Sequence, residues 1–196
     1  MFITTIGEGS TVIRCGCVAC MLKVASGMYR GRKLFSPSDS SSIRPTSGLV
    51  KAAMFNILGD HIAGSTVLEL FCGTGQLSIE ALSRGAKSVC MVDSAKASIE
   101  LAKKNIAALA LEDRARLICS GADRFLAGCT QRFDIVLLDP PYAQDFSTLA
   151  EQIANVLSED GLVVYETDTD SEHKLSSLHT IKRKTYGRRC ITVYGK

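Results

Sequence analysis

The sequence feature that most constrains the fold is an apolar run, Phe133 to Leu138, that ends abruptly in an acid, two prolines and an aromatic residue. Such a run of β-branched and aliphatic residues is typical of a strand buried on both faces of a parallel sheet. Open α/β sheets bind their ligands outside the carboxyl ends of such strands. A residue before proline is restricted to extended geometry, and proline has no N–H. We therefore expect a stiff ligand-binding loop formed by Asp139, Pro140, Pro141 and Tyr142.

This loop suits a reaction in which an amino group on a flat ring meets an electrophile. The lone pair of an exocyclic base amine is delocalised into the ring, so the amine is a poor nucleophile. Hydrogen bonds from the amine to the Asp139 carboxylate and the Pro140 carbonyl would free that lone pair, while Tyr142 stacks on the ring. An ordinary strand end with a proline turn explains the same residues, so the rest of the chain has to decide.

A glycine turn earlier in the chain favours the ligand-binding interpretation. Residues 66–70 predict a strand and residues 76–83 a helix, and Gly73 and Gly75 between them would let the backbone approach a nucleotide-like ligand. Residue 78 is Ser, so the full dinucleotide fingerprint G-x-G-x-x-G is absent. Glu69 is an acid inside the apolar strand, and its burial would suit a cationic amino-acid group better than a pyrophosphate.

Two further acids follow predicted strands. Asp93 ends the strand 88–92 and lies 18 residues after Gly75, close to the spacing expected for a carboxylate that binds ribose hydroxyls. Asp123 follows the strand 115–119 and opens a short helix toward residue 126. Asp123 could reach an adenine amine, and a solvent-facing acid at a helix start is the competing interpretation.

The remaining pattern alternates strands and helices from residue 65 to residue 180, which predicts a mainly parallel α/β sheet with right-handed crossovers. A terminal hairpin, 182–186 and 190–194, is expected to run antiparallel to the rest. Further expected elements are a strand at 22–25, a basic turn at 30–33, a helix at 49–58 capped by Thr46, helices at 95–109, 146–157 and 172–177, and a strand at 161–166.

Composition limits the environment of the protein. A chain of 196 residues with 46% hydrophobic residues can bury one sizeable core, and no apolar run is long enough to span a membrane. The 8 irregularly spaced cysteines favour a reducing compartment, hence the cytoplasm. Cys15, Cys17 and Cys20 resemble metal-ligand spacing but have no fourth ligand nearby, so no metal is expected. Residues 1–21 are expected to be a disordered leader or to precede the native start, residues 22–60 a basic arm with a first helix, and residues 61–196 the main domain.

Basic residues gather at the two ends of the chain. Residues 23–51 carry a net charge of +5, residues 180–196 carry +6, and the remainder carries −8. Basic ends around an acidic middle suggest a polyanionic partner, although solvated faces give the same pattern. The residues expected to hold phosphates are Arg30, Arg32, Lys33, Arg44 and Arg188.

Together these motifs resemble the class I methyltransferases that act on amino groups, and more narrowly the RsmD family of bacterial guanine-N2 methyltransferases of 16S ribosomal RNA. The resemblance rests on four separated signatures in the right order and covers residues 22–196. They are YRGRKL at 29–34, IRPTSGLVKAAMFNIL at 43–58, LFCGTG at 70–75 and YG near the end. The broader resemblance to class I methyltransferases rests on residues 66–86, Asp93 and DPPY at 139–142.

The resemblance implies a Rossmann-like, seven-stranded sheet with helices on both faces and an antiparallel C-terminal strand. It also implies S-adenosylmethionine as cofactor, ribosomal RNA or an assembling small-subunit particle as substrate, and a monomer. Family members often have an acid at position 121, where this chain has glycine, so the adenine contact would pass to Asp123 or to backbone. The cofactor-binding residues that it implies are Glu69, Phe71, Gly73, Gly75, Asp93, Ala122 and Asp123.

Other functions remain open on the sequence. The same loop serves N6-adenine and protein-glutamine methyltransferases, which usually carry Asn at position 139. A nucleotide-binding module or dehydrogenase uses a similar glycine turn. A structural RNA-binding protein would leave residues 139–142 without a task.

Overall fold

The computed structural model describes residues 22–36, 48–140, 147–169 and 175–196. The proposed leader, the Thr46 cap, Arg44, Pro141 and Tyr142 lie outside these residues. Within the described part of the chain, no helix is long and apolar enough to cross a bilayer. The same residues contain no group of three or more potential His, Cys, Asp or Glu ligands for a metal ion.

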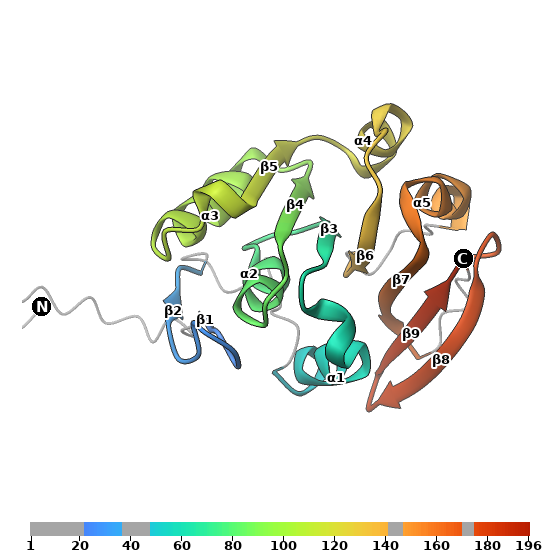
Figure 1. Cartoon of the computed structure of the whole chain (residues 1–196), viewed down its shortest axis with the longest axis horizontal. Coiled ribbons are helices and arrows are strands. Elements are labelled where there is room, and N and C mark those ends of the chain that lie inside the picture. The colour runs from blue at the N-terminus through green and yellow to red at the C-terminus, as the bar shows by residue number, and fades with distance from the viewer. Residues whose placement is uncertain (1–21, 37–47, 141–146, 170–174) are drawn as a thin grey trace, which may run out of the picture.

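A seven-stranded sheet forms the centre of the fold, as predicted (Figure 1), with the strand order β5-β4-β3-β6-β7-β9-β8. The strands β3 to β7 are all parallel, and β9 pairs antiparallel with both β7 and β8. Their bounds are β3 Thr66–Leu70, β4 Ser88–Asp93, β5 Ala115–Cys119, β6 Phe133–Leu138, β7 Leu157–Asp168, β8 His179–Tyr186 and β9 Arg189–Gly195. The chain adds β4 and β5 on one side of β3 and then β6 and β7 on the other side. This reversal of strand order makes a topological switch point between β3 and β6.

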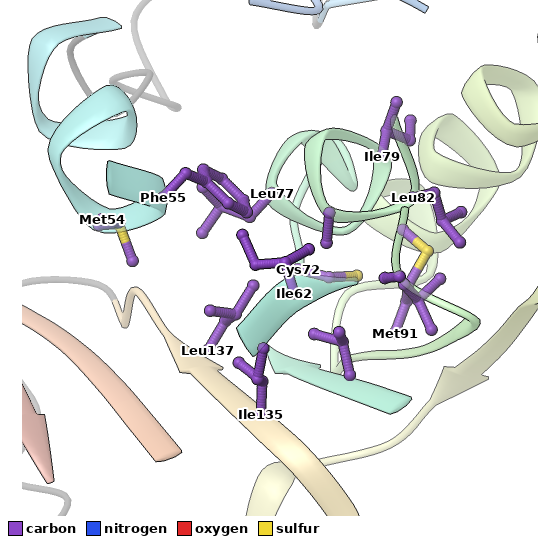
Figure 2. Packing of buried hydrophobic residues seen from close by; sticks show 14 of the residues in the cluster. Met54, Phe55, Ile62, Cys72, Leu77, Ile79, Leu82, Met91, Ile135 and Leu137 are labelled. Atoms are coloured by element: carbon purple, nitrogen blue, oxygen red, sulfur yellow. The ribbon is translucent and has the colours of Figure 1, made fainter. Parts of the chain in front are cut away.

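Helices cover both faces of the sheet. One buried cluster joins the sheet to α1 (Gly48–Leu58), α2 (Gln76–Ser83) and α3 (Lys96–Ala107), and the other joins it to α4 (Ala122–Gly128) and α5 (Ala150–Val156). Figure 2 shows the first cluster, with Phe55 of α1 and Leu77 of α2 above Leu137 of β6. Because side chains alternate along a strand, Glu69, between Leu68 and Leu70 of the second cluster, points to the face covered by α1, α2 and α3. Three short 3₁₀ turns connect these elements, η1 (Gly59–Ile62), η2 (Glu112–Arg114) and η3 (Ser147–Leu149).

A small hairpin of β1 (Leu22–Lys23) and β2 (Lys33–Leu34) is fastened to the first helical layer. The buried amide of Asn105 in α3 accepts a hydrogen bond from the Phe35 N–H at 2.6 Å. It donates to the carbonyls of Phe35 at 3.1 Å and Thr74 at 2.9 Å. One side chain therefore ties the hairpin to the glycine turn.

Three predicted elements differ from the structure. The helix expected at 146–157 is η3 followed by the short α5, and Leu157 instead starts β7, where it pairs with Phe133. The β7 strand is longer than predicted because a register shift between Phe133 and Ile135 lets it continue past the polar residues 158–160. In the predicted helix 172–177, residues 175–177 form no helix, and the other three lie outside the described residues.

The remaining boundaries shift by a few residues. The strand expected at 22–25 is confined to β1, and α3 is shorter than 95–109, although Leu109 remains buried. The expected basic turn at 30–33 ends one residue earlier, because Lys33 pairs with Lys23. The terminal hairpin is confirmed, but β8 begins at residue 179 and runs in the same direction as β7.

Candidate cofactor and acceptor site

The predicted site residues come from the carboxyl ends of three neighbouring strands. In the sheet register Leu70 of β3 pairs with Val92 of β4 on one side and with Leu138 of β6 on the other. The residues that follow these three positions, Phe71, Asp93 and Asp139, therefore lie along one edge of the sheet at the switch point. Residues separated by up to 68 positions in sequence are thus neighbours.

The turn after β3 is held in a conformation that few residues adopt. Phe71 has a φ of 62°, unusual for a bulky side chain, and Gly73 and Gly75 have φ values of 52° and 75°. The surroundings of the two glycines differ. A Cβ at Gly75 would stand 2.1 Å from Met91 Cε, so glycine is needed for close packing, whereas a Cβ at Gly73 would meet nothing within 4 Å. Gly73 thus combines a strained backbone with open space beside the turn.

Asp93 organises this turn. Its Oδ2 accepts a hydrogen bond from the Gly73 N–H at 2.9 Å, and its Oδ1 accepts one from the Ala95 N–H at 2.8 Å. The carboxylate is only half-buried, so a further donor such as a ribose hydroxyl can approach it. Ribose binding by Asp93 stays a prediction, while its bond to Gly73 is a role that the spacing did not reveal.

Glu69 is buried beneath the turn. It is 3% exposed, and its Oε2 accepts a hydrogen bond from the Ser78 N–H of α2 at 3.0 Å. The pKa of Glu69 is raised to about 8, chiefly by burial and also by the nearby Asp139 and Asp93, while the Ser78 hydrogen bonds lower it. A buried carboxyl group with this pKa gains from a cationic neighbour, which would make its ionised form favourable.

The start of α4 brings Asp123 over Gly121. A Cβ at Gly121 would lie 2.6 Å from Asp123 Oδ1, so this carboxylate occupies the space that a side chain at position 121 would need. Ala122 is buried, whereas Asp123 is exposed. This placement fits the expectation that Asp123 stands in for the acid absent at position 121, and its contact with adenine stays a prediction.

Asp139 and Pro140 directly follow β6, and both are half-buried. Asp139 acts electrostatically on Glu69, Glu166 and Lys51, which locates its carboxylate among them. The acceptor-loop residues Pro141 and Tyr142 lie outside the described residues.

The comparisons with known proteins agree with this architecture. The family model described as Conserved hypothetical protein 95 matches residues 22–195. Ribosomal RNA small subunit methyltransferase D of Escherichia coli (strain K12) is 35% identical over 145 residues, which cover 74% of this chain and 71% of that protein. The chain belongs to the RsmD family.

Other relatives match nearly their whole length. The Bacillus subtilis (strain 168) protein YlbH is 34% identical over 89% of this chain and 99% of its own. Among solved structures, Escherichia coli yhhF matches with a TM-score of 0.75 and 29% identity, covering 89% of this chain and 97% of that one. The fold is therefore that of a class I methyltransferase, as the resemblance predicted.

Two charged residues near Asp139 in this RsmD-family site were not singled out from the sequence. Lys51 of α1 has its pKa lowered by burial, against the opposing effect of Glu80, Asp139, Glu166 and Glu69. Glu166, near the end of β7, is 3% exposed. The signal for Glu166 was present, since it is an acid ending an apolar strand beside the Asp139 strand.

The basic residues do not form one cluster. Arg30, Arg32 and Lys33 are exposed on or beside the β1–β2 hairpin, and Arg32 donates to the Ala108 carbonyl at 3.2 Å. Arg188 is exposed in the turn between β8 and β9. Figure 1 shows the β1–β2 hairpin beside α2 and the β8–β9 hairpin as the far edge of the seven-stranded sheet, so any phosphate contacts would flank the site from two directions.

Proposed function

We propose that this chain transfers a methyl group from S-adenosylmethionine to the N2 amine of a guanine in 16S ribosomal RNA. The observation that carries the proposal is the position of Asp139, at the switch point beside the glycine turn, in a chain 35% identical to a ribosomal RNA small subunit methyltransferase D. The activity belongs to the class of rRNA methyltransferases, and the guanine acceptor is the finer part of the proposal.

The residues present suit S-adenosylmethionine. Glu69 supplies a buried carboxyl group whose raised pKa favours a cationic partner such as the α-ammonium group of the methionine moiety. Gly73 leaves room beside a turn that leads directly into the amino end of α2. Asp93 offers oxygens for the ribose, and Asp123 and Ala122 lie where an adenine ring would rest. When bound, the cofactor supplies an activated methyl group on a sulfonium.

The acceptor residues act on the amine. Asp139 and the Pro140 carbonyl accept its two N–H bonds, which directs the nitrogen lone pair toward the methyl carbon. The bound cofactor would supply the methyl group and a neutral thioether as leaving group, and the proton that the amine loses would pass to the Asp139 carboxylate. Alignment of nitrogen, carbon and sulfur supplies most of the rate increase, because held reactants avoid the entropic cost of encounter. The base must leave its stack to reach this loop.

The decisive test compares Asp139→Ala with Asp160→Ala, an exposed acid at the opposite end of the sheet. The assay measures radiolabelled methyl transfer to 16S RNA and to assembling small-subunit particles, and the labelled nucleoside is identified after digestion. Asp139→Ala should bind S-adenosylmethionine normally and lose at least 100-fold in transfer, of the order seen when one preorganised group is removed. Asp160→Ala should match the wild type. Full turnover by Asp139→Ala, or label recovered as N6-methyladenosine, would refute the proposal.

A further inference from the structure

Glu166 stands directly beside the acceptor loop. In the parallel register Leu138 of β6 pairs with Tyr165 of β7, so the next residues, Asp139 and Glu166, occupy neighbouring positions on adjacent strands. Adjacent strands lie about 4.8 Å apart. The two carboxylates are therefore close enough to reach neighbouring atoms of one ring.

Glu166 also points to the same face as the rest of the site. Tyr165 belongs to the core cluster under α4 and α5, and Val164 belongs to the cluster under α1, α2 and α3. Alternation along the strand directs Glu166 to the α1 side, as it directs Glu69 on β3. Lys51 of α1 acts electrostatically on both of these carboxylates and on Asp139.

The hydrogen bonding of Glu166 is incomplete. Its Oε1 lies 3.7 Å from Arg189 Nε, beyond hydrogen-bond distance, while Arg189 Nη1 makes a closer ion pair of 3.2 Å with Asp168. Its Oε2 is buried and accepts no hydrogen bond from the part of the chain that the structure describes. A buried acceptor without a protein partner is destabilising for the folded protein, and a donor bound at Oε2 would satisfy it.

The electrostatics of Glu166 fit a donor ligand. Its pKa is raised to about 8, chiefly by burial and also by Asp139 and Asp168, while Lys51 lowers it. A ligand N–H placed at Oε2 would favour the ionised form. A ligand that presents a lone pair at the same place is repelled by this ionised form.

We propose that Glu166 is a specificity-determining residue whose carboxylate accepts the N1–H of the guanine whose N2 amine is held by Asp139 and Pro140. This inference rests on the guanine-N2 transfer proposed above. The Watson–Crick edge of guanine presents N1–H and the N2 amine as adjacent donors, which match two adjacent carboxylates. Adenine presents an acceptor, N1, beside its N6 amine, so the same pair of carboxylates rejects it when Glu166 is ionised.

The test pairs a substrate change with a residue change. Wild type, Glu166→Ala and Glu166→Gln are assayed on the 16S fragment that carries either guanosine or 1-deazaguanosine at the methylated position. The analogue keeps the 2-amino group and replaces N1–H by an isosteric C–H. Glu159→Ala is the matched control, because Glu159 lies on the same strand with its side chain 88% exposed.

Loss of one hydrogen bond to a charged acceptor is expected to change the guanosine to 1-deazaguanosine rate ratio by about 10- to 100-fold. Wild type and Glu159→Ala should share a high ratio. Glu166→Ala should reduce this ratio at least tenfold while calorimetry shows unchanged S-adenosylmethionine binding. Glu166→Gln keeps the size of the side chain and one neutral acceptor oxygen, so its rate ratio should lie between those of the wild type and Glu166→Ala. This variant still tests the role of Glu166 if the alanine variant does not fold.

The outcomes separate the two proposals. Normal guanine methylation by the wild type, with the same ratio in the Glu166 variants as in the wild type, overturns the role of Glu166 alone. If the wild type transfers no methyl group to guanine N2, the proposed function itself fails and this inference falls with it.

Discussion

Replacing Glu69 with glutamine should change how the stability of the protein depends on pH. The pKa of Glu69 is raised from 4.5 to about 8, chiefly by burial, so between these values the folded chain holds a proton that the unfolded chain has lost. Stability therefore falls as the pH rises through this window, with a limiting slope of about 1.4 kcal/mol per pH unit and a total of at most roughly 5 kcal/mol. Glutamine keeps an acceptor for the Ser78 N–H and removes the titration.

The measurement is chemical unfolding of the wild type and Glu69→Gln at pH values from 5 to 9. The difference in unfolding free energy should shift in favour of Glu69→Gln up to about pH 8 and then level off. Glu159→Gln, an exposed acid on β7, should follow the wild type throughout. Parallel curves for wild type and Glu69→Gln would show that the buried carboxyl group does not titrate as the structure requires. Glu69→Gln should also bind S-adenosylmethionine more weakly than the wild type, because the cationic ammonium group of the cofactor loses its counter-charge.

Three further perturbations test the turn and the sheet. Asp93→Ala should weaken cofactor binding at least tenfold in calorimetry, because the Gly73 N–H loses its acceptor; unchanged affinity would contradict this role. Gly73→Ala and Gly187→Ala should each cost about 1 kcal/mol in thermal unfolding, since both have positive φ and open space around them. Only Gly73→Ala should lose cofactor affinity, and equal affinity in the two variants would refute the assignment of that space to the cofactor. Burial raises the pKa of Asp134, but hydrogen bonds from Thr66 outweigh burial and lower the pKa below its usual value. Asp134→Ala should therefore destabilise the folded protein at neutral pH, and acid unfolding titrations should show this destabilisation disappearing as the pH falls.

Much of the parallel sheet could be predicted because its strands contain apolar runs, and in β4 and β6 this run leads directly into an acid. Asp93 and Asp139 were placed at strand ends for that reason, and the register confirms that they share one edge of the sheet. The burial of Glu69 followed from the same apolar pattern. Period-two patterns reveal strands, and strand ends reveal where ligands bind in this class of fold.

The features that could not be predicted from the sequence depend on contacts between helices and strands. Nothing in the helical pattern around Lys51 shows that α1 lies over the ends of β3, β6 and β7, which is what gives this lysine its acidic neighbours. The helix predicted at 146–157 ends at Val156 because Leu157 of β7 pairs with Phe133, which overrides local helical preference. Tertiary pairing of this kind has no local sequence signal.

Asn105 couples the N-terminal hairpin mechanically to the glycine turn. Its fully buried amide joins the Phe35 backbone of the N-terminal hairpin to the Thr74 carbonyl of the glycine turn, so displacement of either segment breaks bonds that also hold the other. If RNA binds Arg30 or Arg32 as proposed, a displacement of the hairpin would be transmitted directly to the glycine turn, the proposed binding segment for S-adenosylmethionine. Substrate capture and donor retention would then be linked through a single amide group.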